Sequence, residues 1–322
     1  MPPSRHLSPV FVSVSLVLLQ CSTGVARAAT DGGRCDAPAP AVAKQPWRHS
    51  HHAKYATSLG APNHRIRDLL LAPGQTGVHL RGRFTYGAAD KDLEHETIEV
   101  WFQRCPAWER WATLTTDHDG VVQADVPADL PPGTYQVRMI VAGDLSFAEG
   151  TIAVWRPGTQ VIVSDIDGTL TTGDGELFRD LAGGRDAAMY ADANTVMQSL
   201  ARKGYRLVYL TGRAQLVNRY TRGWLAKNGF PSAPLLLTED GSQALPGVAG
   251  VGGFKAGVLN DLQARLKVRF VAGYGNAIGR SRTCRFDRKL RELHIQAIGG
   301  RTIAQDAKMN GSTDEKKREN YR

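Results

Sequence analysis

The chain has 322 residues, of which 42% are hydrophobic and 22% are charged, enough for two modest domains with packed cores. Its formal net charge of +9 suggests a nucleic-acid or anionic-membrane partner. From residue 280 to the end, however, 12 Lys and Arg accompany only 6 Asp and Glu, so most of the excess lies in that stretch. Because these basic residues lack interleaved aromatics, we expect no nucleic-acid partner.

The first 28 residues are typical of a signal peptide. Arg5 precedes the apolar run Val10–Leu19, which is too short to span a bilayer permanently, and Ala26 and Ala28 are small residues suited to cleavage after Ala28. The pattern predicts export, to the periplasm or the extracellular space. The alternatives are an uncleaved anchor, a buried core helix, and a lipoprotein with lipid on Cys21.

Residues 29–72 are rich in Ala, Pro, Gly and His and show little periodicity, so they are predicted to form a linker with a short helix near Ile66 to Leu71. His49, His51 and His52 could bind a metal ion. No carboxylate or Cys stands near them in the sequence, so we favour an exposed polar loop.

Cleavage after residue 28 would leave Cys35, Cys105 and Cys284, an odd number. A disulfide between Cys35 and Cys105 would suit an oxidising compartment. All three can equally be small, unpaired residues, so the sequence leaves their pairing open.

Residues 73–156 show short alternating segments divided by turn signals, which predicts a small immunoglobulin-like β-sandwich. The expected strands are 78–84, 97–102 and 135–141. No catalytic constellation is evident in this region.

Residues 157–280 alternate between strand and helix patterns, which predicts a doubly wound parallel sheet of the α/β class. The expected strands are 160–164, 206–210, 235–237 and 268–272, and the expected helices are 192–203, 216–228 and 254–266. Ligands bind such sheets beyond the carboxyl ends of the strands, and the polar clusters of this region fall at those ends.

Asp165 and Asp167 directly follow the first of these strands, with Gly168 allowing the chain to turn. One carboxylate can attack phosphorus to form an aspartyl phosphate, and the other can protonate the leaving oxygen and activate water. Two neighbouring carboxylates repel each other and favour a cation, and Mg²⁺ suits phosphate chemistry.

The run of residues 165–171, DIDGTLT, resembles the first motif of the haloacid dehalogenase superfamily, DxDGT. More narrowly, residues 158–278 resemble the catalytic domain of lipins, the magnesium-dependent phosphatidate phosphatases. The resemblance implies that Asp165 is the nucleophile and Asp167 the general acid/base. Both would hold Mg²⁺, the latter through its backbone carbonyl.

The same resemblance assigns roles to later residues. Thr211 would bind a phosphate oxygen, and Gly212 would allow close backbone approach. Lys255 would hold the transferring group and offset the charge of Asp165. Asn276 would be a further metal ligand. The family pattern places an Asp four residues after this Asn, where the chain has Arg280, which puts Mg²⁺ affinity in doubt.

The sequence thus predicts an uncapped, exported, magnesium-dependent phosphomonoester hydrolase, with phosphatidate as the expected substrate and a peripheral contact with anionic membrane. Some lipin-like domains lack the catalytic acids and recognise phosphatidate instead, so a catalytically inactive phosphatidate-binding module is the alternative. Residues 281–322 form a basic stretch without family likeness, which is either a divergent tail or the product of a frameshift.

Overall fold

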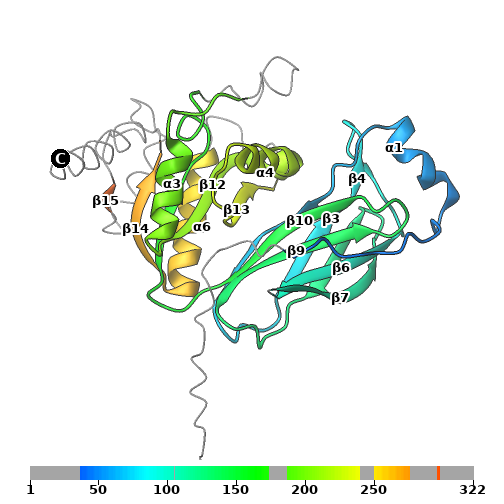
Figure 1. The fold of residues 1–322 in the computed structure, drawn as a ribbon, viewed down its shortest axis with the longest axis horizontal. Coiled ribbons are helices and arrows are strands. Elements are labelled where there is room, and N and C mark those ends of the chain that lie inside the picture. The colour runs from blue at the N-terminus through cyan, green and yellow to red at the C-terminus, as the bar shows by residue number, and fades with distance from the viewer. Residues whose placement is uncertain (1–36, 105, 174–186, 240–249, 276–295, 298–322) are drawn as a thin grey trace, which may run out of the picture. The chain divides into compact units, whose positions relative to one another are not determined.

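The computed structural model describes residues 37–104, 106–173, 187–239, 250–275 and 296–297 (Figure 1). The predicted signal peptide, all four cysteines, Asn276 and Arg280 lie outside these residues. Within them, no helix combines the length and the apolar character needed to cross a bilayer.

The N-terminal segment contains more regular structure than a linker. A 3-10 helix, η1 (Ser50–Lys54), leads into the short helix α1 (Tyr55–Ser58), and two strands follow, β1 (Arg65–Ile66) and β2 (Leu69–Leu71). The helix expected near residues 66–71 is therefore wrong. Strand β2 pairs in parallel with the distant strand β10 (Phe147–Val154), and a pairing over that separation leaves no local signal in the sequence.

Two sheets make up the region before residue 155. The smaller has the order β1-β3-β8, with β3 at His79–Arg83 and β8 at Val121–Asp125. The larger has the order β2-β10-β9-β6-β7, with β6 at Thr97–Arg104, β7 at Ala107–Thr115 and β9 at Gly133–Val141. The short strands β4 (Thr85–Tyr86) and β5 (Lys91–Asp92) form a separate pair. The three strands expected here are confirmed as β3, β6 and β9.

The two sheets share one buried hydrophobic cluster. Leu80 and Val122 from the smaller sheet and Val137, Met139 and Ile152 from the larger belong to it. Residues two apart on one strand face the same side, which explains how the alternating pattern supplies this core.

The region after residue 159 contains a parallel sheet with the order β13-β12-β11-β14-β15. Its strands are β11 (Gln160–Ser164), β12 (Arg206–Ala214), β13 (Leu235–Thr238), β14 (Arg269–Tyr274) and β15 (Gln296–Ala297). The helices are α3 (Ala193–Arg202), α4 (Asn218–Lys227), preceded by the 3-10 turn η2 (Gln215–Val217), and α6 (Gly250–Leu266). The four expected strands and three expected helices are confirmed, with shifts of a few residues at their ends.

Alternate residues of β11 belong to two different hydrophobic clusters. Ile162 packs in a cluster with Met197 of α3 and Trp224 of α4, whereas Val163 packs in a cluster with Leu259 of α6. A strand buried among apolar residues on both faces reads as a continuous apolar run, which is why residues 161–163 show no polar alternation. The doubly wound and immunoglobulin-like classifications of the two regions stay predictions.

Candidate functional site

Asp165 follows β11 directly and lies in the interior of the α/β region. Its backbone N–H donates to the Tyr274 carbonyl at 2.9 Å, which continues the β11–β14 pairing, and its Oδ1 accepts from the Ile166 N–H at 2.8 Å. Lys255 Nζ lies 2.5 Å from its Oδ2, and both side chains are at most 10% exposed. The nucleophile and the phosphate-binding lysine expected from the sequence therefore form a buried ion pair with each other.

Burial raises the pKa of Asp165 above its ordinary value, and the nearby Asp167 carboxylate adds to this effect. The Lys255 ammonium opposes the rise in pKa through its charge and its hydrogen bond, without reversing it. Asp165 thus depends on Lys255 to carry a charge in this buried position.

The second carboxylate, Asp167, pairs with a different cation, Arg213. The Arg213 Nε lies 3.1 Å and 2.9 Å from the two carboxylate oxygens, and its Nη2 donates to Oδ1 at 2.8 Å. Thr211 Oγ1 donates to Asp167 Oδ2 at 3.1 Å. The site thus pairs two carboxylates with two cations, and its formal charge is zero.

No role was predicted for Arg213 from the sequence. Its side chain is only 2% exposed, and Nη1 donates to Thr221 Oγ1 of α4 at 3.2 Å, so the guanidinium is held from two sides. Residues two apart on a strand share a face, so the position of Arg213 two residues after Thr211 was the available signal.

Gly168 turns the chain directly after the two acids. Its φ of 64° lies in the left-handed region, which confirms the need for glycine there. In the same loop, the hydroxyl of Thr169 is buried and has no hydrogen-bond partner among the described residues. A buried hydroxyl without a partner is a group that a bound oxygen anion would satisfy.

Gly212 has a packing role that does not involve a ligand. A Cβ at this position would lie 2.7 Å from both methyl groups of Val251 on α6. Glycine therefore allows α6 to approach β12, and the close approach to a phosphate expected for Gly212 stays a prediction.

A magnesium ion at this site stays a prediction. Mg²⁺ prefers oxygen ligands. The Asp165 carboxylate is paired with Lys255, so an ion bound there would share that carboxylate with a cation. Arg213 occupies the side chain of Asp167 and not the backbone carbonyl expected to bind the ion. Asn276, the third expected ligand, lies outside the described residues.

Comparisons with known proteins give this chain its domain types. Residues 162–282 match the family model described as PITM 1-3, LNS2 domain, and residues 62–154 match PITM 1-3, beta-sandwich domain. LNS2 domains belong to the haloacid dehalogenase-like superfamily, so the expected LNS2-type domain with a β-sandwich before it is confirmed.

Several relatives of the chain carry the names of phosphatidylinositol transfer proteins. It is 29% identical over 255 residues to Membrane-associated phosphatidylinositol transfer protein 1 of Rattus norvegicus, covering 75% of this chain and 19% of the relative. It is 30% identical to Protein retinal degeneration B of Drosophila melanogaster, covering 67% and 17%. It is 31% identical to Membrane-associated phosphatidylinositol transfer protein 2 of Homo sapiens, covering 62% and 15%. The chain thus spans less than a fifth of the length of each of these relatives.

The expectation of a magnesium-dependent phosphatase acting through an aspartyl phosphate is wrong. The named relatives are phosphatidylinositol transfer proteins and not phosphatases. In the structure the Asp167 carboxylate is bound to Arg213, whereas an acid or base would need it free. The contact of Asp165 with Lys255 is the one expected from the sequence. The DxDGT motif alone did not reveal the Arg213 partner.

Proposed function

We propose that the α/β domain is a binding module for phosphatidate or a closely related phospholipid with a phosphomonoester head group. The observation that supports this most directly is that Lys255 of α6 pairs with Asp165 directly after β11, while Thr211 and Arg213 near the carboxyl end of β12 bond Asp167. Parallel sheets bind ligands at the carboxyl ends of their strands. Arginine and lysine with a neighbouring hydroxyl are the donors that phosphate prefers.

Asp167 is the group that the head group would replace. Its side chain is 22% exposed, whereas Arg213 behind it is 2% exposed, so solvent reaches the pair through the carboxylate. Under this proposal the phosphate takes the place of the Asp167 carboxylate on the guanidinium, because both anions accept two parallel hydrogen bonds from arginine. The unpartnered hydroxyl of Thr169 supplies a further donor.

The lipid setting of the proposal rests on the names of the relatives, which are membrane-associated phosphatidylinositol transfer proteins. An uncapped, doubly wound domain of the haloacid dehalogenase type would leave this site open to a head group at a membrane surface. Peripheral contact with anionic membrane is part of the same proposal, and export of the chain remains an expectation beside it.

Vesicle flotation with the full chain tests the proposal. We expect the wild-type chain to float with phosphatidylcholine vesicles that contain phosphatidate. It should float less with vesicles that contain phosphatidylserine at matched surface charge. Arg213→Gln should lower phosphatidate binding by about 10- to 100-fold, the equivalent of one charge-assisted hydrogen-bonded contact.

The matched control is Arg269→Gln, which removes one positive charge from an exposed residue at the opposite end of the same sheet. It should leave phosphatidate binding unchanged, because attraction from a distant exposed charge is screened by salt. Equal loss in both variants, or equal binding to phosphatidylserine, would show non-specific attraction and overturn the proposal. Release of inorganic phosphate by the wild type would overturn it as well.

A further inference from the structure

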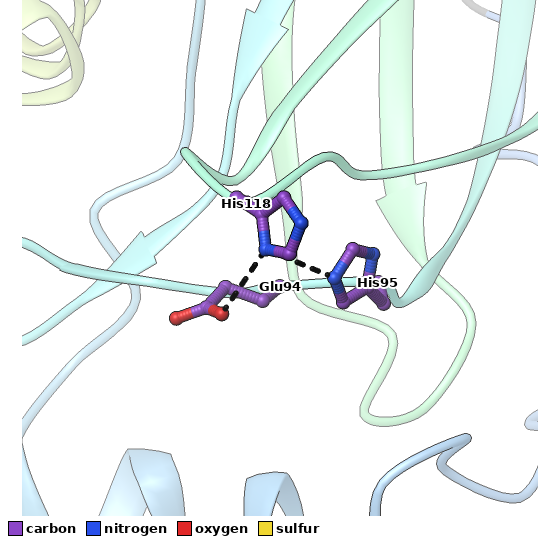
Figure 2. A group of neighbouring side chains, drawn as sticks. All are labelled: Glu94, His95 and His118. Atoms are coloured by element: carbon purple, nitrogen blue, oxygen red, sulfur yellow. Dashed lines mark hydrogen bonds and ion pairs between the residues drawn. The ribbon is translucent and has the colours of Figure 1, made fainter.

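Two turns of the β-sandwich domain bring three potential metal ligands together, apart from the site described above. Glu94 and His95 lie between β5 and β6, and His118 lies between β7 and β8 (Figure 2). One ligand atom from each residue lies within 4.8 Å of the other two. The residues are 23 or 24 positions apart across the two turns, so the sequence gave no hint of the cluster.

The two imidazoles are spaced like neighbouring ligands of one ion. His95 Nε2 and His118 Nδ1 lie 3.2 Å apart, and their rings meet edge to face. A tetrahedral zinc ion with Zn–N bonds of about 2.0–2.1 Å separates its nitrogen ligands by about 3.3 Å. Glu94 Oε2 lies 4.0 Å from His118 Nδ1, which makes Glu94 the third potential ligand.

Backbone hydrogen bonds fix both turns. The His95 N–H donates to the Thr116 carbonyl at 3.1 Å, and the Thr116 N–H donates to the Glu96 carbonyl at 3.0 Å, which joins the two turns. In the second turn, Asp117 Oδ1 accepts from the backbone N–H groups of residues 119 and 121 at 2.9 Å and 2.8 Å. The ligands therefore project from a framework that is already ordered, which lowers the entropic cost of binding an ion.

The histidine-rich segment noticed in the sequence lies next to this cluster. The buried carboxylate of Glu96 accepts from the backbone N–H of Arg48 at 3.1 Å and of His49 at 2.9 Å, and it bonds His52 Nδ1 at 2.8 Å. The His49 ring centroid consequently lies 6.2 Å from that of His95. The partners that seemed to be missing from the sequence around His49 are supplied by the turns of the sandwich.

We propose that Glu94, His95 and His118 form a binding site for a divalent first-row transition-metal ion, of which zinc is the representative. Two imidazoles and one carboxylate suit zinc and its neighbours, whereas Mg²⁺ and Ca²⁺ prefer sets made only of oxygen. Three protein ligands leave one position open for water. The site is independent of the phosphate site, because it uses none of the same residues.

Lys91 competes for one of these ligands. Its Nζ lies 2.7 Å from Glu94 Oε1, while the other oxygen of Glu94 faces His118. The carboxylate can thus keep its contact with Lys91 and offer Oε2 to an ion.

Zinc titration of the untagged full chain by calorimetry tests the proposal. We expect the wild type to bind one zinc ion at this site. In His118→Ala the affinity of the site for zinc should fall at least about 100-fold, which is more than the loss of an outer-shell hydrogen-bond partner costs. Glu94→Gln should weaken the same site. Mg²⁺ should produce no binding at this site.

His79→Ala is the matched control, because His79 is likewise exposed on the sandwich and paired with an acid, Asp125, but lies outside the cluster. It should bind zinc as the wild type does. Cobalt substitution checks the ligand type. A visible spectrum typical of nitrogen and oxygen ligands, present in the wild type and absent in His118→Ala, supports the assignment. Equal zinc uptake by the wild type and His118→Ala, or a thiolate charge-transfer band that persists in that variant, would overturn it.

Discussion

In the α/β domain, Arg213 binds both carboxylate oxygens of Asp167, with donor–acceptor distances of 2.8–3.1 Å. A guanidinium in this position balances the charge of the second acid of the DxDGT motif. Together with the pairing of Asp165 and Lys255, it makes the site electrically neutral. A neutral, preformed site of this kind suits exchange of one anion for another, which is what binding a phosphate requires.

Removal of the competing carboxylate should strengthen lipid binding. In Asp167→Asn, Arg213 keeps a hydrogen-bonding neighbour but loses its internal anion, so a phosphate no longer has to displace a charge. We expect phosphatidate affinity to rise about tenfold, equivalent to about 1.4 kcal/mol, in a vesicle titration. Weaker binding than in the wild type would show that Asp167 assists the phosphate and does not compete with it.

Phosphatidate binding should not depend on magnesium. Both acids of the motif already have cationic partners, so we expect the dissociation constant for phosphatidate vesicles to be the same in EDTA and in millimolar Mg²⁺ at matched ionic strength. Matched ionic strength is needed because screening alone changes attraction to an anionic surface. Loss of binding in EDTA would show that a metal ion is required.

Local pattern was sufficient to predict the α/β elements. The run 160–164 could be predicted as a strand because a buried parallel strand is apolar throughout, and it forms β11. Gly204 and Gly229, with φ of 89° and 71°, end helices at the expected places. The strands β1 and β2 were missed because their pairing is long-range. The contact of Lys255 with Asp165 was expected from the family resemblance. The pairing of Asp167 with Arg213 was missed because it joins residues 46 positions apart.

Gly212 should resist substitution because of helix packing. In Gly212→Ala, the new Cβ would lie 2.7 Å from both methyl groups of Val251, and a β-branched side chain cannot rotate them both away. We expect a loss of stability of about 1–3 kcal/mol, seen as faster hydrogen exchange of the β12 amides.

A second substitution separates packing from backbone effects at Gly212. Val251→Ala in the Gly212→Ala background should recover part of the lost protection, since it removes the methyl groups that clash. Gly223→Ala is the control: it lies exposed within α4 with nothing near its Cβ, so it should stabilise the helix by about 0.5–1 kcal/mol. Unchanged protection of β12 in Gly212→Ala would contradict the packing explanation.

His64 should make the β-sandwich domain sensitive to acid. Burial lowers the pKa of His64 to about 3. Its Nδ1 accepts from the backbone N–H of Thr85 at 3.2 Å, which places the ring proton on Nε2, where it donates to Ser146 Oγ at 2.8 Å. Protonation of Nδ1 would set two N–H groups against each other, so the folded state holds the neutral ring.

The sign of the effect follows from proton binding. Between pH 6.5 and about pH 3 the unfolded chain binds a proton at His64 that the folded chain does not, so stability falls as the pH drops through this window. Above pH 6.5 the contribution is constant. At pH 5.0 the loss amounts to about 2 kcal/mol, from 1.5 pH units at about 1.36 kcal/mol each.

His64→Gln should remove this sensitivity, because glutamine does not titrate and its amide can still donate to Ser146. The measurement is hydrogen exchange of the β9 and β10 amides at pH 7.5 and 5.0, corrected for the intrinsic dependence of exchange on pH. The difference in protection between the two pH values should shrink by about 2 kcal/mol in the variant. His79→Gln, a change at a half-exposed histidine, should leave that difference as it is in the wild type. If both variants keep the full acid sensitivity, a group other than His64 is responsible for it.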